Sequence, residues 1–112
     1  MNHSLAPLTL THGKTKLKIN FLETKKAAMI LRALNHPLRQ KMLKLLDEKK
    51  KITVTEVYGK LKLEQSVASQ HLAILRRANI VSTIRDGKFI YYSPNYDRIE
   101  EVLKFTDELV GQ

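Results

Sequence analysis

The chain has 112 residues, which is enough for one domain with a hydrophobic core and too few for two. Hydrophobic residues make up 43% of it and charged residues 28%, as in a folded globular protein and not a disordered one. It has no apolar run of the roughly 18 residues that a membrane span needs, and its start lacks the pattern of a secretory signal. Cysteine is absent, which excludes disulfides, thiolate metal ligands and thiol catalysis. We therefore expect a cytoplasmic protein.

The net charge of +9 is unevenly distributed along the chain. Residues 1–23 hold three lysines and one glutamate, which gives +2. Residues 24–93 hold fifteen basic and five acidic residues, which gives +10, and residues 94–112 hold two basic and five acidic residues, which gives −3. A basic folded body favours a polyanion as partner, either nucleic acid or a membrane surface, whereas the ordinary alternative is a solvated surface.

The first residues differ in pattern from the rest. Residues 1–20 lack a sustained hydrophobic period and are predicted to form a flexible basic arm, with a short ordered piece over Leu17–Phe21. From Thr24 the pattern is helical, with one apolar stripe along Ala27, Ile30, Leu31 and Leu34. We expect residues 21–112 to form a single domain.

Three further helices are predicted before residue 80. Pro37 opens a helix to about Glu48. Thr53 and Glu56 form a capping box at the start of a short helix. After a tight connection at Lys62-Leu63, a fourth helix runs from Glu64 or Gln65 to Ala78, with Ala68, Leu72 and Leu75 on its inner side.

A hairpin and a last helix complete the chain. Residues 80–85 and 88–93 are rich in β-formers and flank Asp86-Gly87, a strong hairpin signal. The last helix is expected from Tyr96 to Val110. The fold class is therefore mainly α with a small β-hairpin, in the order α-α-α-α-β-β-α, which is a winged helix-turn-helix.

The outer side of the fourth helix is small, polar and mostly uncharged, unlike a merely solvated face, which would carry more lysine and glutamate. Such a face suits the major groove, where glutamine pairs with adenine and serine contacts bases or phosphates. The candidate DNA-binding residues on this helix are Gln65, Ser66, Ser69, Gln70 and Ala73.

Arg85 and Lys88 flank the hairpin tip, where two cations suit phosphate or minor-groove contact. The alternative is that an exposed tip is simply polar. His71 lies beside the inner line of the fourth helix and is interpreted as a structural histidine, and His36 as a capping or turn residue. No two histidines have helical ligand spacing, so we predict no metal site and no cofactor.

The last helix carries a wider apolar stripe than packing on its own domain requires. We expect it to form a homodimer interface together with the first helix. The alternative is a monomer in which both helices pack on their own core. The predicted interface residues are Ile30, Leu31, Ile99, Val102, Leu103, Phe105 and Leu109.

Three segments in this order resemble the ArsR family of winged helix-turn-helix regulators. They are residues 33–39 (ALNHPLR), residues 63–81 around the fourth helix, and residues 85–92 at the hairpin. The similarity covers about residues 24–110. It implies a dimeric transcriptional regulator, most often a repressor that leaves its operator when an effector binds.

The chain departs from that family in its sensing residues. Many members bind metals through cysteines near the third helix, where this chain has residues 52–56 (ITVTE), and others use histidines on the last helix, where this chain has only carboxylates. Thiol sensing is therefore excluded, and metal sensing is not carried over from the family. The sequence does not identify an effector: a small molecule near the dimer interface, a partner protein, and a metal held by carboxylates and histidines all stay open. Glu64 and Asn79 replace the usual serine and glycine at the ends of the fourth helix, and both residues suit those positions.

The sequence thus favours a regulator that binds a pseudo-palindromic double-stranded DNA operator, with no membrane partner. A winged-helix module that binds protein instead of DNA is the alternative, and the basic middle of the chain argues against it. An enzyme is disfavoured, because no phosphate-binding loop, nucleophile–base pair or metal cluster is present.

Overall fold

The computed structural model describes residues 7–111, and these divide between two compact units, residues 1–32 and 33–112. The first part of the predicted arm, residues 1–6, lies outside the described residues. The division falls inside the first helix, and not before it as expected at residue 20.

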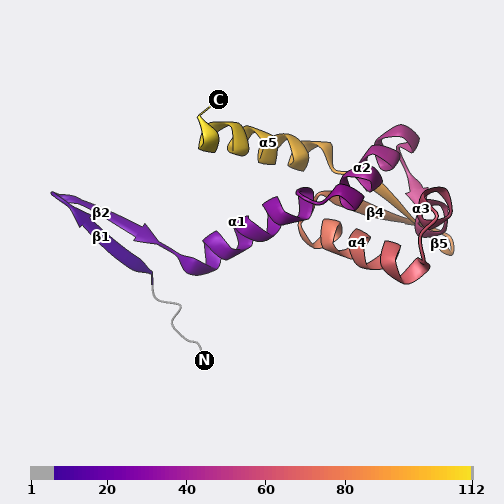
Figure 1. The fold of residues 1–112 in the computed structure, drawn as a ribbon, viewed down its shortest axis with the longest axis horizontal. Coiled ribbons are helices and arrows are strands. Elements are labelled where there is room, and N and C mark those ends of the chain that lie inside the picture. Colours follow the sequence, from indigo (N-terminus) through magenta and orange to yellow (C-terminus); the bar gives the residue numbers. More distant parts are fainter. Residues whose placement is uncertain (1–6, 112) are drawn as a thin grey trace. The chain divides into compact units, whose positions relative to one another are not determined.

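The first unit contains a β-hairpin that the sequence analysis missed. Strands β1 (Leu8–His12) and β2 (Thr15–Ile19) pair antiparallel through a Gly13-Lys14 turn (Figure 1). Gly13 has a φ of 62°, which the first position of a two-residue hairpin turn of type II′ requires. The prediction of an arm without regular structure is therefore wrong over residues 8–16, whereas the ordered piece predicted over Leu17–Phe21 coincides with the end of β2 and the start of α1. The cause is the short alternation, which is only four or five residues on each side of the glycine.

Helix α1 (Phe21–Leu34) follows the hairpin after one residue. It begins three residues earlier than predicted because Asn20 caps it. The Asn20 side-chain oxygen accepts hydrogen bonds from the backbone N–H groups of Leu22 (3.0 Å) and Glu23 (3.1 Å).

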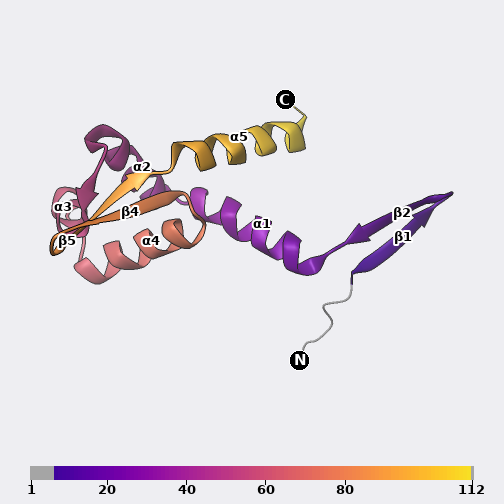
Figure 2. The same ribbon diagram turned by 180° about the vertical axis from the view of Figure 1, so that it is seen from behind.

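The second unit has the predicted winged-helix order. It comprises α2 (Pro37–Lys49), β3 (Ile52–Thr53), α3 (Val54–Leu61), α4 (Gln65–Arg77), β4 (Val81–Asp86), β5 (Phe89–Pro94) and α5 (Tyr96–Val110). Strand β5 pairs antiparallel with both β3 and β4, and the β4–β5 ribbon runs alongside α4 (Figures 1 and 2). Every helix expected in this unit is confirmed to within two residues.

The core of this unit is formed by the predicted inner sides of its helices and by the sheet. Burying such side chains contributes roughly 1.5–3 kcal/mol each, which fixes the helices against one another. The largest fully buried residues are Met42, Leu46, Ile52, Val57, Leu72, Leu75, Ile80 and Val81.

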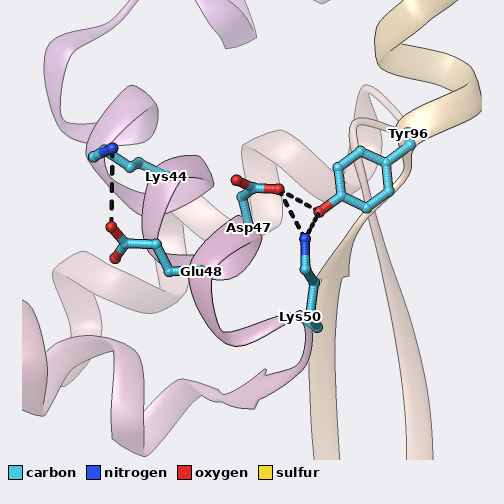
Figure 3. A network of polar contacts seen from close by, with 5 residues as sticks. All are labelled: Lys44, Asp47, Glu48, Lys50 and Tyr96. Carbon is cyan, nitrogen blue, oxygen red and sulfur yellow. Dashed lines mark hydrogen bonds and ion pairs between the residues drawn. The ribbon is translucent and has the colours of Figure 1, made fainter.

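A polar network joins the end of α2 to the start of α5 (Figure 3). The Tyr96 hydroxyl donates to the Asp47 carboxylate (2.5 Å), and the Lys50 ammonium donates to that carboxylate (3.3 Å) and to the Tyr96 oxygen (3.2 Å). The hydrogen bond from Tyr96, followed by the contact with Lys50, lowers the pKa of Asp47. These contacts join the start of α5 to the end of α2.

Candidate nucleic-acid interface

Helices α3 and α4 form a tight helix-turn-helix. The side chain of Thr53 accepts from the backbone N–H of Glu56 (3.2 Å) and the Glu56 carboxylate accepts from the backbone N–H of Thr53 (3.1 Å), so the predicted capping box is confirmed. Lys62 adopts the left-handed conformation (φ 55°), and the N–H of Leu63 returns to the Tyr58 carbonyl (2.9 Å). This closed turn sets the direction in which α4 begins.

Helix α4 buries one side and presents the other. Ala68, Leu72 and Leu75 are fully buried, as predicted. Because residues three and four apart share a helix face, this anchors the helix with its opposite side outward. The four serine and glutamine residues of the predicted contact face are all exposed: Gln65, Ser66, Ser69 and Gln70. Ala73, the fifth member, is half-buried.

Arg39 of α2 supports α4 from inside. Its Nε donates to the Ala33 carbonyl (2.7 Å), and its Nη1 donates to Nδ1 of His71 on α4 (3.1 Å). Because guanidinium has only donors, Nδ1 is the acceptor and the proton of the neutral imidazole lies on Nε2. The interpretation of His71 as a structural histidine is therefore confirmed.

His36 completes this support. Its Nδ1 accepts from the backbone N–H of Leu38 (3.1 Å) and so caps α2, as predicted, while its ring lies 4.8 Å from that of His71. Burial, followed by the proximity of His36 and Arg39, lowers the pKa of His71. Neutral His71 therefore holds α4 against α2 near neutral pH.

The last turn of α4 adds cations that the sequence analysis did not assign to the interface. Arg76 and Arg77 line a hollow of about 300 Å³ together with Ala73 and Tyr92 of β5. The sequence did contain a signal for this assignment. Two adjacent arginines end a helix whose first turn carries no charge. The half-buried Ala73 lies at this hollow.

The hairpin β4–β5 is the predicted wing. Asp86 pairs with Phe89, so the central turn residues are Gly87 and Lys88, one position later than the Asp86-Gly87 pair singled out from the sequence. Gly87 has a φ of 65°, which explains the shift because the turn needs glycine at its first position. Lys88 therefore lies in the turn itself.

Arg85 lies on the side of the wing that faces α4. Side chains alternate along a strand, so Arg85 shares a face with Thr83, and Thr83 is paired with Tyr92, which lines the hollow beside α4. Arg85 and Lys88 are both exposed. The uncharged face of α4 is thus accompanied by cations at the end of the helix and on the wing.

The described part of the chain offers no group of three or more histidine and acidic side chains that could hold a metal ion. Between residues 7 and 111, no helix has the length and apolarity needed to cross a membrane.

Comparison with known proteins identifies this arrangement. The sequence model described as "Bacterial regulatory protein, arsR family" matches residues 36–83, which run from the cap of α2 into the wing. An uncharacterised HTH-type transcriptional regulator of Methanocaldococcus jannaschii is 39% identical over 75% of this chain and 94% of its own length. The transcriptional repressor PagR of Bacillus anthracis is 34% identical over 82% of this chain and 92% of its own length.

The chain belongs to the ArsR family. The crystal structure of NolR from Sinorhizobium fredii, 38% identical, superposes with a TM-score of 0.63 over 81% of this chain and 90% of that one. This ArsR-family protein is a DNA-binding transcription regulator with a winged helix-turn-helix fold and is not an enzyme. The resemblance drawn from the sequence is therefore confirmed.

Proposed function

We propose that this ArsR-family regulator is a homodimeric repressor in which α4 reads base edges in the major groove of a pseudo-palindromic operator. The observation that carries the proposal is the exposed, uncharged serine and glutamine face of α4 in a chain that is otherwise strongly basic. A lysine on such a face would bind any phosphate, whereas neutral donors and acceptors distinguish one base pair from another.

The roles divide along the helix and the wing. Gln65 and Gln70 can pair bidentately with adenine, and Ser66 and Ser69 can bond base edges or phosphates. Ala73 is small enough to let the helix approach the groove closely. Arg85 and Lys88 on the wing, together with Arg76 and Arg77, neutralise phosphates on either side of the groove.

Helix α5 supports the dimer. Leu103, Phe105 and Leu109 are 53%, 48% and 65% exposed, and an apolar surface of this kind on a helix is stabilised by burial against a partner. Val102 is an exception to the predicted interface. It is only 7% exposed within the single chain, so it is a core residue and its assignment to the interface is wrong.

The reason for this correction lies in the two sides of α5. The helix is apolar on both sides, and the sequence does not say which side packs inside its own chain. Ile99 is half-buried, as are Ile30 and Leu31 of α1. These three remain in the proposed interface, in which two copies related by a twofold axis present two α4 helices to successive half-sites.

Repression requires only that the bound dimer occupies a promoter. The names of relatives include a transcriptional repressor, PagR, and a transcriptional activator, HlyU of Vibrio cholerae. We assign repression because a protein that binds promoter DNA can repress without any further contact. The chain has no cysteine, so its release from DNA does not depend on its own thiols. Its place of action is the cytoplasm, where the operator lies.

In vitro selection from a random duplex library tests this proposal. We expect an enriched motif with twofold symmetry, whose half-sites are centred about 10 base pairs apart or a multiple of that spacing. A promoter carrying the motif should then lose activity when the protein is expressed. A motif without symmetry would contradict the dimer, and raised promoter activity would contradict repression. Absence of duplex binding even at low salt would favour the protein-binding alternative.

A further inference from the structure

The hairpin β1–β2 has two chemically different faces. Its register pairs Leu8 with Ile19 and Leu10 with Leu17, so these four side chains share one face. Thr9 pairs with Lys18 and Thr11 with Lys16, so the opposite face is polar and cationic. The family match begins at residue 36, so neither face belongs to the matched winged-helix region.

The cationic face has the properties of a phosphate-binding ribbon. Lys16 and Lys18 stand about 6.6 Å apart along the strand, since each residue advances it by about 3.3 Å. Lys14 stands at the turn, and no acidic residue occurs from Pro7 to Asn20 to neutralise the three lysines. All three are exposed.

This hairpin and the wing share the same turn chemistry. Gly13-Lys14 and Gly87-Lys88 are both two-residue turns with a glycine of positive φ followed by lysine. Each hairpin therefore has a lysine in its turn. The wing carries one further exposed cation, Arg85, on its strands, whereas β2 carries two, Lys16 and Lys18.

The two faces of the hairpin differ in what burial would cost. Leu10 and Leu17 are 46% and 51% exposed, and an isolated hairpin is at best marginally stable in water, so burial of that face is favourable. Burial of lysine is unfavourable. Whichever protein surface covers the leucines, the lysine face therefore remains available to a polyanion.

We propose that the face formed by Lys14, Lys16 and Lys18 is a second DNA-backbone contact of this regulator, in addition to α4 and the wing. This inference rests on the proposed function. The hairpin is joined to the winged domain through α1, so binding of that domain to the duplex brings the hairpin near the DNA. The tether raises the effective concentration of the ribbon at the DNA. The contact is made to phosphates, so it adds affinity without sequence preference.

The salt dependence of DNA binding tests the proposal. The variant K14Q/K16Q/K18Q of the full chain is compared with K41Q/K49Q/K104Q, which loses the same charge from exposed lysines on α2 and α5. The slope of log K against log salt is negative, and each lost phosphate contact reduces its magnitude by about 0.9, so the magnitude should fall by about 2 to 3 in the ribbon variant. Its preference for the selected motif over random duplex should be unchanged.

An arginine variant and anionic lipid vesicles distinguish a DNA contact from a structural role of the lysines and from membrane binding. K14R/K16R/K18R should restore the slope, which a merely structural effect of the lysines would not require. Equal slopes for the ribbon variant and the α2–α5 control would overturn the ribbon contact while leaving the proposed function intact, whereas failure of the unaltered protein to bind duplex would overturn both. Loss of binding to anionic lipid vesicles with an unchanged DNA slope would assign the lysine face to a membrane surface instead.

Discussion

At the scale of single residues, neutral and charged side chains have separate tasks on the DNA-binding side of this protein. The exposed glutamine and serine face of α4 carries no charge of its own, and the cations lie at the end of the helix and on the wing. A neutral hydrogen-bonding group discriminates between bases, whereas a cation attracts every phosphate. Substitutions of the two kinds should therefore have different signatures.

Lys88→Ala should weaken binding to all DNA sequences alike. Lys88 is exposed in the wing turn, where a phosphate contact has no sequence information. We expect the magnitude of the negative slope of log K against log salt to decrease by about 1, measured by fluorescence anisotropy with the selected motif and with random duplex. An effect confined to the motif would show that Lys88 contacts a base. Lys104→Ala on α5 is the matched control.

The His71 imidazole makes stability depend on pH. Burial and the neighbouring His36 and Arg39 lower the pKa of His71, so the folded chain binds its proton less readily than the unfolded chain. The contribution of neutral His71 is thus fully present above the ordinary histidine pKa and decreases as the pH falls through that value toward the lower pKa of the folded state. Protonation also ends the hydrogen bond from Arg39, since Nδ1 then carries a proton.

His71→Asn keeps an acceptor near the position of Nδ1 and removes the titration. Urea unfolding at pH 8 and pH 5 should show a smaller loss of unfolding free energy in this variant than in the unaltered protein. The other histidines are the same in both proteins, so the comparison isolates the contribution of His71. Equal losses in the two proteins would mean that His71 does not contribute to the pH dependence.

At the scale of elements, local signals decided what the sequence could predict. The capping box at Thr53, the proline at the start of α2 and the Gly87 turn each act within four residues, and the corresponding elements are confirmed. The hairpin β1–β2 was missed because the alternation of apolar and polar residues in its two strands is short, at five residues each. The same signal, glycine at the first turn position, identifies both hairpins in retrospect.

Thr53→Ala should destabilise the helix-turn-helix by about 1 kcal/mol, because it removes the side-chain acceptor for the backbone N–H of Glu56. Urea unfolding followed by circular dichroism measures this change. Thr55→Ala, at an exposed position of the same helix, should change the unfolding free energy by less than about 0.5 kcal/mol. Equal effects of the two substitutions would contradict the role of the cap.

At the scale of the whole molecule, the sequence predicted which residues of α4 and the wing are exposed, but it did not predict which further residues lie beside them. The exposed residues of α4 and the wing follow from helix and strand periodicity. The hollow lined by Arg76, Arg77 and Tyr92 does not, because it depends on the contact between α4 and β5, which are separate in the chain. Val102 was misassigned for the same reason, since only packing distinguishes the two apolar sides of α5.

Leu103→Glu should separate the proposed dimer into folded monomers. A carboxylate at this exposed apolar position would be desolvated in the interface and is solvated in the monomer. Sedimentation velocity measures the oligomeric state, and circular dichroism checks that the fold is kept. Thr55→Glu adds the same charge on α3 and should leave the dimer intact. A dimer that persists in Leu103→Glu would place the interface elsewhere.

The contact between α4 and base edges is tested most directly by the specificity ratio of Gln70→Ala, the affinity for the selected motif divided by that for random duplex at one salt concentration. A bidentate pair with a base contributes about 1–3 kcal/mol of discrimination, so we predict that the ratio falls at least about fivefold while binding to random duplex is nearly unchanged. A ratio equal to that of the unaltered protein would contradict base reading by this face of α4.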